Sequence, residues 1–356
     1  MKIALIGCGR IAQVAHLPAL ARIPEFKLVG VMDASSLLAD GVAAQYGARS
    51  YTDLDQMLTE TTPAAVIIAV PDRLHHELAI RCLRAGKDVL LEKPLSSTVE
   101  QGQLIIDAVR DTGHLLQVAT MKRHDPGVAY ARKVIAEELG PVLSFTAWYR
   151  ATSMRDNVTA LFPPVVSDTT VTATERTFKA DTGVYWLNTH ASHLFDTIGY
   201  VLDDQFASLT AYRNDHAGDI SWQIAGRLTG GAVGTADLTV NIHGDGAEGM
   251  DIRCERGHLT LSTFLPFAKR ASEVRVYRDS TETVSEPVLG YADAYENQLR
   301  AFLSACTARR TALPMPALHG DLGFGAPASV DDGQQVLKML AAVTTSAASE
   351  TPVSLR

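Results

Sequence analysis

The chain has 356 residues, which at roughly 150 residues per domain predicts two domains. It carries 32 Lys and Arg against 40 Asp and Glu, so its formal net charge is −8. This balance argues against nucleic-acid-binding and polybasic membrane-surface proteins, and the apolar fraction of 46% is typical of a folded globular protein.

The sequence also predicts no membrane span and no disulfide framework. The longest stretch without a charged residue, Thr182 to Phe195, is shorter than the roughly 20 apolar residues that cross a bilayer. The cysteines are scattered and form no C-x-x-C pair: Cys8, Cys82, Cys254 and Cys306. We therefore expect a cytoplasmic protein that contacts neither membranes nor nucleic acids.

Residues 1–121 predict an α/β Rossmann domain, in which helices cover both faces of a doubly wound parallel sheet. Near-continuous apolar runs, typical of strands buried on both faces, occur at Lys2–Ile6, Lys27–Met32, Ala65–Val70, Asp88–Leu91 and Leu115–Ala119. Helical patterns alternate with them at Ile11–Ala21, Leu37–Tyr46, Leu74–Ala85 and Thr98–Val109. Pro18 should kink the first of these helices.

Residues 122–356 predict an α+β domain with a large, mostly antiparallel open sheet. Its expected strands are Val142–Arg150, Ala207–Tyr212, Ile220–Leu228, Ala232–Asn241, His258–Ser262 and Glu273–Tyr277. Its expected helices are Gly127–Glu138, Ala292–Ala308 and Val330–Ala347, and the last of them is a candidate to pack back on the first domain. An exposed apolar sheet face commonly becomes a subunit contact, so we expect a homodimer or homotetramer through this sheet.

The segment from Ala151 to Ala180 shows little periodicity, which predicts a structureless lid or binding loop. In and just after it lie four polar candidates for substrate contact: Arg155, Lys179, Asp181 and Tyr185.

The first strand runs directly into Gly7-Cys8-Gly9-Arg10-Ile11-Ala12, a G-x-G-x-x-A motif at a strand-to-helix turn. Gly7 permits the tight turn, Gly9 lets the backbone approach a pyrophosphate, and the helix N-terminus at Arg10 and Ile11 offers N–H groups to the anion. Asp33 ends the next strand, where a carboxylate accepts bonds from the ribose hydroxyls of a dinucleotide. Because this charge repels a 2′-phosphate, we favour NAD over NADP, although Arg10 could reach a phosphate.

Two further segments follow strand ends, where doubly wound sheets bind ligands. One contains Pro71 and His75, and the other is Glu92-Lys93-Pro94. Because proline pushes the preceding residue out of the helical region, Lys93 should be extended and point into the crevice. Partial desolvation there would lower the pKa of Lys93 and suit it to proton transfer. We expect Pro71, His75, Glu92 and Lys93 to lie beside the cofactor.

The run from Ala85 to Pro94, with the upstream glycines, resembles the family of glucose–fructose oxidoreductase and inositol dehydrogenase, the Gfo/Idh/MocA oxidoreductases. Further matches are the spacing of Pro71 and His75, the segment from Lys122 to Pro126, and the segment from His193 to Asp196. The resemblance implies that Lys93 binds the reacting oxygen of a sugar or cyclitol and that His193 acts as the acid or base. It also implies a cis peptide between Lys93 and Pro94.

The chain departs from the family pattern at two positions. Asp72 stands where the family often has Asn, and Thr189 stands where it often has an Asp four residues before the catalytic histidine. Asn188 and Thr189 cannot ionise, so the Lys–Asp–His constellation is incomplete. The predicted substrate-binding residues are Lys93, Arg123, Tyr185, Asn188, Thr189 and His193.

The sequence thus predicts an NAD-dependent dehydrogenase that oxidises a secondary hydroxyl of a sugar, sugar acid or cyclitol, or reduces the corresponding ketone. The hydride would go to nicotinamide C4, and Lys93 or His193 would take the proton. Two alternatives remain: a redox-neutral NAD-dependent glycosidase, and a non-catalytic NAD-binding sensor or co-repressor. His190, His193 and Asp196 share a helix, but no further ligand cluster accompanies them, so no metal is expected.

Overall fold

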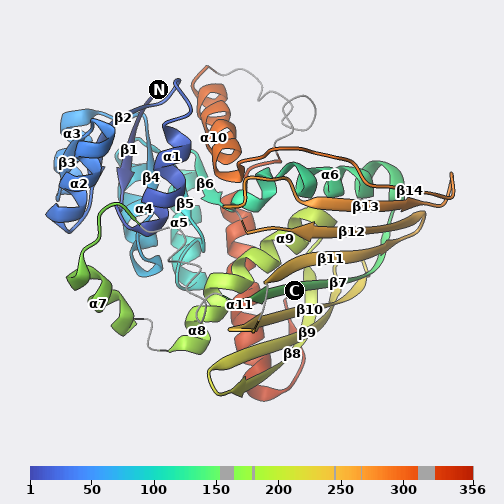
Figure 1. The fold of residues 1–356 in the computed structure, drawn as a ribbon. Coiled ribbons are helices and arrows are strands. Elements are labelled where there is room, and N and C mark those ends of the chain that lie inside the picture. The colour runs from blue at the N-terminus through green and yellow to red at the C-terminus, as the bar shows by residue number, and fades with distance from the viewer. Residues whose placement is uncertain (153–163, 179–180, 244–245, 266, 312–324, 356) are drawn as a thin grey trace.

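The structure is a computed structural model, and it describes residues 1–152, 164–178, 181–243, 246–265, 267–311 and 325–355. Two sheets organise the chain, and Figure 1 shows them side by side, with helices packed around the first and along one face of the second. The first sheet is built from the N-terminal third of the chain, and the second is built from strands after residue 140.

The first sheet has six parallel strands in the order β3-β2-β1-β4-β5-β6. Their bounds are β1 Lys2–Ile6, β2 Lys27–Met32, β3 Arg49–Tyr51, β4 Ala65–Ile68, β5 Asp88–Glu92 and β6 Leu116–Ala119. The helices between them are η1 Ala12–His16 with α1 Leu17–Leu20, α2 Ser36–Tyr46, α3 Leu54–Thr61, η2 Asp72–Leu74, α4 His75–Arg84 and α5 Val99–Thr112. The predicted Rossmann architecture is confirmed.

The sequence missed β3 and α3. Strand β3 is short and two of its three residues are exposed, so it has no apolar run. Pro18 is accommodated differently from the predicted kink. The preceding turn, Ala12–His16, widens into a π-helix, and α1 then begins at Leu17 with Pro18 in its first turn, where a missing N–H is tolerated.

The second sheet has nine strands in the order β14-β13-β12-β11-β7-β10-β9-β8-β15, and only the β7–β10 pair among these described strands is parallel. Their bounds are β7 Val142–Ala151, β8 Phe206–His216, β9 Asp219–Leu228, β10 Val233–Val240, β11 Ala247–Cys254, β12 Gly257–Thr263, β13 Glu273–Arg278, β14 Thr283–Ser285 and β15 Val353–Ser354. The predicted mostly antiparallel sheet is confirmed. The sequence missed β11, β14 and β15, of which β11 pairs with β7 at the centre of the sheet.

The helices of the second part are η3 Met121–His124, α6 Pro126–Val134 with η4 Ile135–Leu139, α7 Thr169–Phe178, α8 Thr182–Trp186 with η6 Leu187–Ala191 and α9 Ser192–Leu202, α10 Ala294–Thr311 and α11 Val330–Ser349. Helix α7 corrects the expectation that the whole of 151–180 is structureless. Arg155 and Lys179 lie outside the described residues. Helix α11 packs on both α5 and β8, so it bridges the two sheets.

The open face of the second sheet differs from the apolar face that the sequence predicted. Its strand register aligns Thr146 with Asp251 on one side and Thr235 on the other. Ion pairs lie on the same face between Arg150 and Asp237 and between Arg253 and Asp251. These residues make the face more polar than predicted, and the same register also places Trp148 and Val233, which is 44% exposed, on it.

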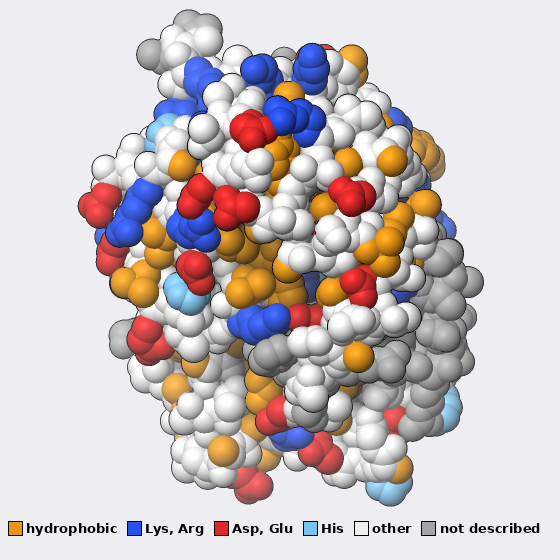
Figure 2. Space-filling view, turned by 90° about the vertical axis from the view of Figure 1, so that its left-hand side faces the viewer, with side chains coloured by type: hydrophobic (Ala, Val, Ile, Leu, Met, Phe, Trp, Pro, Cys, Tyr) orange, Lys and Arg blue, Asp and Glu red, His pale blue; other side chains and the backbone are white. Residues whose placement is uncertain are grey.

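The surface carries no concentrated positive charge on the side of the first domain. Figure 2 shows Lys and Arg side chains scattered there among Asp and Glu, with hydrophobic side chains gathered in a hollow between them. None of the helices in the described ranges is both long and apolar enough to cross a bilayer.

Candidate active site

The strand order of the first sheet reverses between β1 and β4, and this reversal opens a crevice at their carboxyl ends. Gly7 lies there with φ +91°, and a Cβ on it would come within 2.4 Å of the Ala69 carbonyl oxygen. A Cβ on Gly9 would meet no atom within 4 Å. The first glycine therefore permits the tight turn, and the second leaves open space beside the backbone, as a pyrophosphate requires.

Asp33 lies half-buried at the same edge. Its Oδ2 accepts a hydrogen bond from the Cys8 N–H at 2.7 Å, and its Oδ1 accepts one from the Ser35 N–H at 2.9 Å. These bonds hold the Asp33 carboxylate next to the glycine turn, where half-buried Arg10 and Ile11 open the helix. The residues present fit a dinucleotide whose adenosine ribose bonds to Asp33.

The Lys93–Pro94 peptide is cis, as the resemblance implied. His75 is fully buried beneath it, with Nδ1 2.8 Å from the Pro94 carbonyl oxygen and Nε2 2.9 Å from the Val70 carbonyl oxygen. His75 therefore ties the turn after β4 to the turn after β5. Pro71, half-buried, begins the short helix η2 between them.

Glu92 is 7% exposed, so the alternative of a solvated charge is wrong. Its Oε1 lies 2.7 Å from Nε2 of buried His16, and its Oε2 accepts the Lys93 N–H at 3.1 Å. Although burial opposes ionisation, the hydrogen bond and charge of His16 hold the pKa of Glu92 below its ordinary value. In this structure Glu92 fixes the backbone of Lys93.

Lys93 reaches from the first domain to the helix that carries His193. Its Nζ donates to the carbonyl oxygen of Thr189 at 3.2 Å, which also accepts from the Ser192 hydroxyl at 3.2 Å. Thr189 and half-buried Asn188 lie on η6, a π-helical turn between α8 and α9. Such turns are frequent at functional sites. Tyr185 lies one turn earlier, also half-buried, with its ring 4.9 Å from that of Trp186.

Five side chains form what we call the Lys93–His193 cluster: Lys93, Lys122, Tyr149, His190 and His193. The buried Tyr149 ring lies 5.3 Å from the ring of His190 and stacks on that of His193 at 6.3 Å, centroid to centroid. Lys122 places its Nζ 4.6 Å from the centre of the same ring. The structure thus brings Lys93 and His193 together and adds three residues that were not predicted.

Burial is the largest cause of the pKa shifts in this cluster. It lowers the pKa of His193 well below 6.5 and that of His190 to about 3, and the charges of Lys93 and Lys122 lower both further. Both imidazoles are therefore neutral at pH 7, and His193 is able to accept a proton. Neither ring nitrogen of His190 has a hydrogen-bond partner among the described residues.

Lys122 is buried and forms an ion pair with buried Glu248, which in turn accepts a hydrogen bond from the Thr263 hydroxyl at 3.1 Å. Burial lowers the pKa of Lys122 to about 7; the charges of Asp125 and Asp196 oppose this shift, and the charge of Lys93 adds to it. The sequence signal for Lys122 was its place in the matched 122–126 segment. Glu248 had no signal, because β11 was missed.

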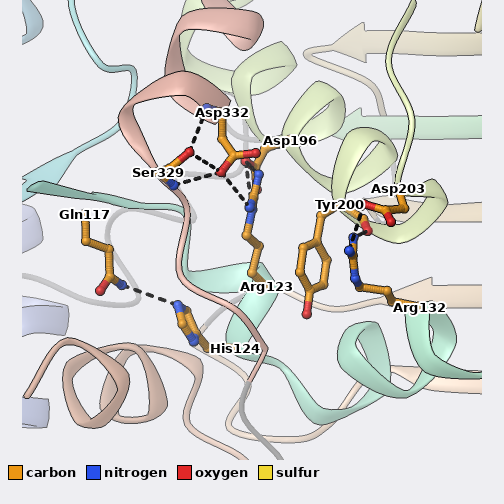
Figure 3. A network of polar contacts seen from close by, with 9 residues as sticks. All are labelled: Gln117, Arg123, His124, Arg132, Asp196, Tyr200, Asp203, Ser329 and Asp332. Carbon is orange, nitrogen blue, oxygen red and sulfur yellow. Dashed lines mark hydrogen bonds and ion pairs between the residues drawn. The ribbon is translucent and has the colours of Figure 1, made fainter. Parts of the chain in front are cut away.

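Arg123 lies outside the Lys93–His193 cluster. Figure 3 shows its guanidinium between Asp196 on α9 and Asp332 on α11, at 2.7 Å and 3.3 Å, while Ser329 bonds to Asp332. The contact of Arg123 with substrate stays a prediction. Arg123 and Arg132 also flank the Tyr200 ring, 5.1 and 4.9 Å from its centre. A cavity of about 460 Å³ lies beside this network. The network joins the helix of His193 to α11.

No three His, Cys, Asp or Glu side chains gather as a metal site within the described ranges. The Lys93–His193 cluster places amines and imidazoles around the Tyr149 ring.

Comparison with known proteins agrees with this geometry. Residues 1–120 match the family described as "Oxidoreductase family, NAD-binding Rossmann fold". The first domain belongs to the Gfo/Idh/MocA oxidoreductase family. The inositol 2-dehydrogenase of Rubrobacter xylanophilus is 33% identical over 141 residues, which cover 39% of this chain and 41% of that one. The chain thus matches about two fifths of that relative's length.

Two matches extend beyond the first domain. The inositol 2-dehydrogenase of Paracoccus denitrificans is 25% identical over 337 residues, 90% of each chain. A structure of levoglucosan dehydrogenase in complex with NADH and L-sorbose superposes with a TM-score of 0.80, covering 100% of this chain and 99% of that one at 24% identity. This superposition shows that levoglucosan dehydrogenase and the present chain share the two-sheet fold.

Proposed function

We propose that the protein is an NAD-dependent dehydrogenase that oxidises a secondary hydroxyl of a sugar, sugar acid or cyclitol, or reduces the corresponding ketone. The observation that carries the proposal is the hydrogen bond from Lys93 Nζ to the Thr189 carbonyl at 3.2 Å, on the helical turn that precedes neutral His193. It brings a cationic donor and a proton acceptor together near the carboxyl edge of a dinucleotide fold.

NAD, when bound, supplies the hydride acceptor. Lys93 would donate hydrogen bonds to the reacting oxygen, and His193 would accept its proton. Thr189 cannot ionise, so this position supplies no carboxylate that would hold His193 cationic, and the lowered pKa of His193 favours its neutral form.

The substrate class is supported by the polar groups in and beside the cluster. The two ring nitrogens of His190 have no partner among the described residues, and the Lys122–Glu248 ion pair lies beside the Tyr149 ring. A polyol presents several hydroxyls and an apolar C–H face, which suits this set. The names of the relatives, which act on inositol and levoglucosan, agree with it. Half-buried Tyr185 and Asn188 would complete the substrate contacts.

The test is absorbance of reduced nicotinamide with purified protein, NAD or NADP, and a panel of inositols, sugars and sugar acids. We expect a rise with NAD and one stereochemical group. A flat response despite NAD binding would contradict the dehydrogenase, and turnover of a glycoside without net reduced cofactor would identify the glycosidase alternative. Binding of NAD and of a regulator without any turnover would identify the sensor.

We also propose a homodimer or homotetramer through the open face of the second sheet. Since that face is more polar than predicted, the ion pairs of Arg150 and Arg253 would lie in the contact. Light scattering after size exclusion tests the assembly, and a monomer at micromolar concentration would contradict it.

A further inference from the structure

Residues 164–178, which we call the strap, run from the second part of the chain along the first domain and end in α7 (Figure 1). Buried Gln13 anchors it at one point: its amide donates to the Val166 carbonyl at 2.9 Å and accepts from the Val166 N–H at 3.0 Å. The Val166 side chain packs over Gly41, where a Cβ would lie 2.6 Å from it. The strap therefore contacts both the glycine-turn helix and α2.

A second anchor lies at the adenosine end of the proposed dinucleotide site. The Ser35 N–H donates to Asp33 Oδ1 at 2.9 Å, and the Ser35 hydroxyl donates to Asp168 Oδ2 at 2.7 Å. One serine thus holds two carboxylates, one from β2 and one from the strap. The Ser35 hydrogen bond is the largest of the causes that lower the pKa of Asp168, which favours its charged form.

This arrangement bears on the choice between NAD and NADP, which differ only by a 2′-phosphate on the adenosine ribose. Asp33 occupies the position whose carboxylate accepts the ribose hydroxyls in such folds. A phosphate monoester carries a charge of about −1.5 to −2 at pH 7. A second negative charge beside Asp33 repels it, and Asp168 also occupies the Ser35 hydroxyl that would otherwise donate to it.

We propose that Asp168 is a specificity-determining residue that acts with Asp33 to exclude NADP from the adenosine end of the site. This inference rests on the proposed function, because it assumes that NAD binds along the glycine turn. A third anchor supports the placement of Asp168: Arg73, in the short helix after β4, pairs with Glu175 of α7 through two bonds of 3.0 and 2.7 Å.

The variant Asp168→Asn isolates the charge. Asp168 Oδ1 accepts the N–H groups of Thr170 at 2.8 Å and Val171 at 3.3 Å, so it caps α7. Asn caps helices about as well as Asp through its single side-chain oxygen, and its Nδ2 would donate to the Ser35 hydroxyl, which would accept instead. The matched control is Asp181→Asn, since Asp181 is exposed and caps α8 through the Val184 N–H at 3.1 Å.

The experiment is calorimetric titration of NAD and NADP into wild type and both variants, at about 0.05 M and 1 M salt. At low salt we expect Asp168→Asn to strengthen NADP binding about five- to tenfold with NAD binding unchanged within twofold, and Asp181→Asn to change neither. The gain should shrink at high salt, because ions screen the repulsion.

An NADP-to-NAD affinity ratio within twofold of wild type in Asp168→Asn, with NAD still bound, would overturn the role of Asp168 and leave the dehydrogenase proposal intact. Wild-type protein that binds neither dinucleotide would overturn the proposed function, and this inference with it.

Discussion

The turn at Lys93–Pro94 and the Lys93–His193 cluster are both buried and polar, yet their hydrogen bonding differs. In the turn, both ring nitrogens of His75 and both oxygens of Glu92 have protein partners. In the cluster, neither ring nitrogen of His190 has a partner among the described residues. A buried polar group without a partner costs free energy, and a bound ligand can supply the missing bonds. Under the proposed function the turn would hold Lys93 in place, and His190 would bond to the substrate.

The largest expected effect tests the ion-pair network of Arg123, which joins the helix of His193 to α11. Arg123→Met leaves Asp196 and Asp332 without their buried cation, and the loss of one partner from a buried ion pair costs about 3–5 kcal/mol. Urea unfolding measures the free energy of unfolding. The control is Arg132→Met, whose partner Asp203 is exposed, with an expected loss of at most about 1 kcal/mol. Equal losses in the two variants would contradict a structural role for the Arg123 network.

The second prediction concerns Lys93, which belongs both to the turn at Lys93–Pro94 and to the Lys93–His193 cluster. Lys93→Ala should lower kcat about 100-fold or more, which is the typical contribution of a positioned acid or base. The dissociation constant of NAD should stay within about threefold of wild type. Steady-state kinetics and NAD titration measure the two. Lys87→Ala, at the opposite end of β5, is the control and should leave both unchanged. Turnover of Lys93→Ala within threefold of wild type would refute the role assigned to Lys93.

The third prediction concerns the cost of burying His190. Its pKa is about 3 in the folded protein against 6.5 in the unfolded chain, so the unfolded chain binds more protons between these values. The contribution of His190 to stability therefore falls as the pH falls below 6.5, by about 2 kcal/mol at pH 5. His190→Phe should reduce the fall in stability between pH 7.5 and 5 by about this amount, measured by urea unfolding, while His124 and His193, whose pKa values are also lowered, keep their contributions. An unchanged slope would mean that His190 is accessible to protons in the folded state.

The smallest expected effect is on the pH dependence of catalysis. Because the pKa of His193 lies well below 6.5, the acidic limb of kcat/KM should also lie below pH 6.5. Lys122→Met removes a nearby positive charge and should move this limb upward by less than about one pH unit, since burial is the larger cause. The pH profiles of wild type and variant measure it. A limb that moves downward would contradict the electrostatic coupling.

The sequence predicted the first domain closely because its signals are local. Strands Lys2–Ile6 and Lys27–Met32 were predicted to the residue, since buried parallel strands are continuous apolar runs. The glycine turn and the Glu92-Lys93-Pro94 segment were likewise readable, since each depends on backbone geometry that specific residues impose.

The remaining features of the site depend on contacts between residues far apart in the sequence. Glu248 meets Lys122 only because β11 pairs with β7, and a strand of alternating charged and apolar residues gave no apolar run to predict it. Asp168 meets Ser35 only because the strap lies along the first domain. By itself the sequence determined the dinucleotide fold and the Glu92-Lys93-Pro94 turn, because those depend on local periodicity and turn chemistry, whereas the prediction for His193 came from the family resemblance. Only the tertiary structure decided which buried charges surround them, because burial and the pKa shifts that it causes depend on contacts between distant segments.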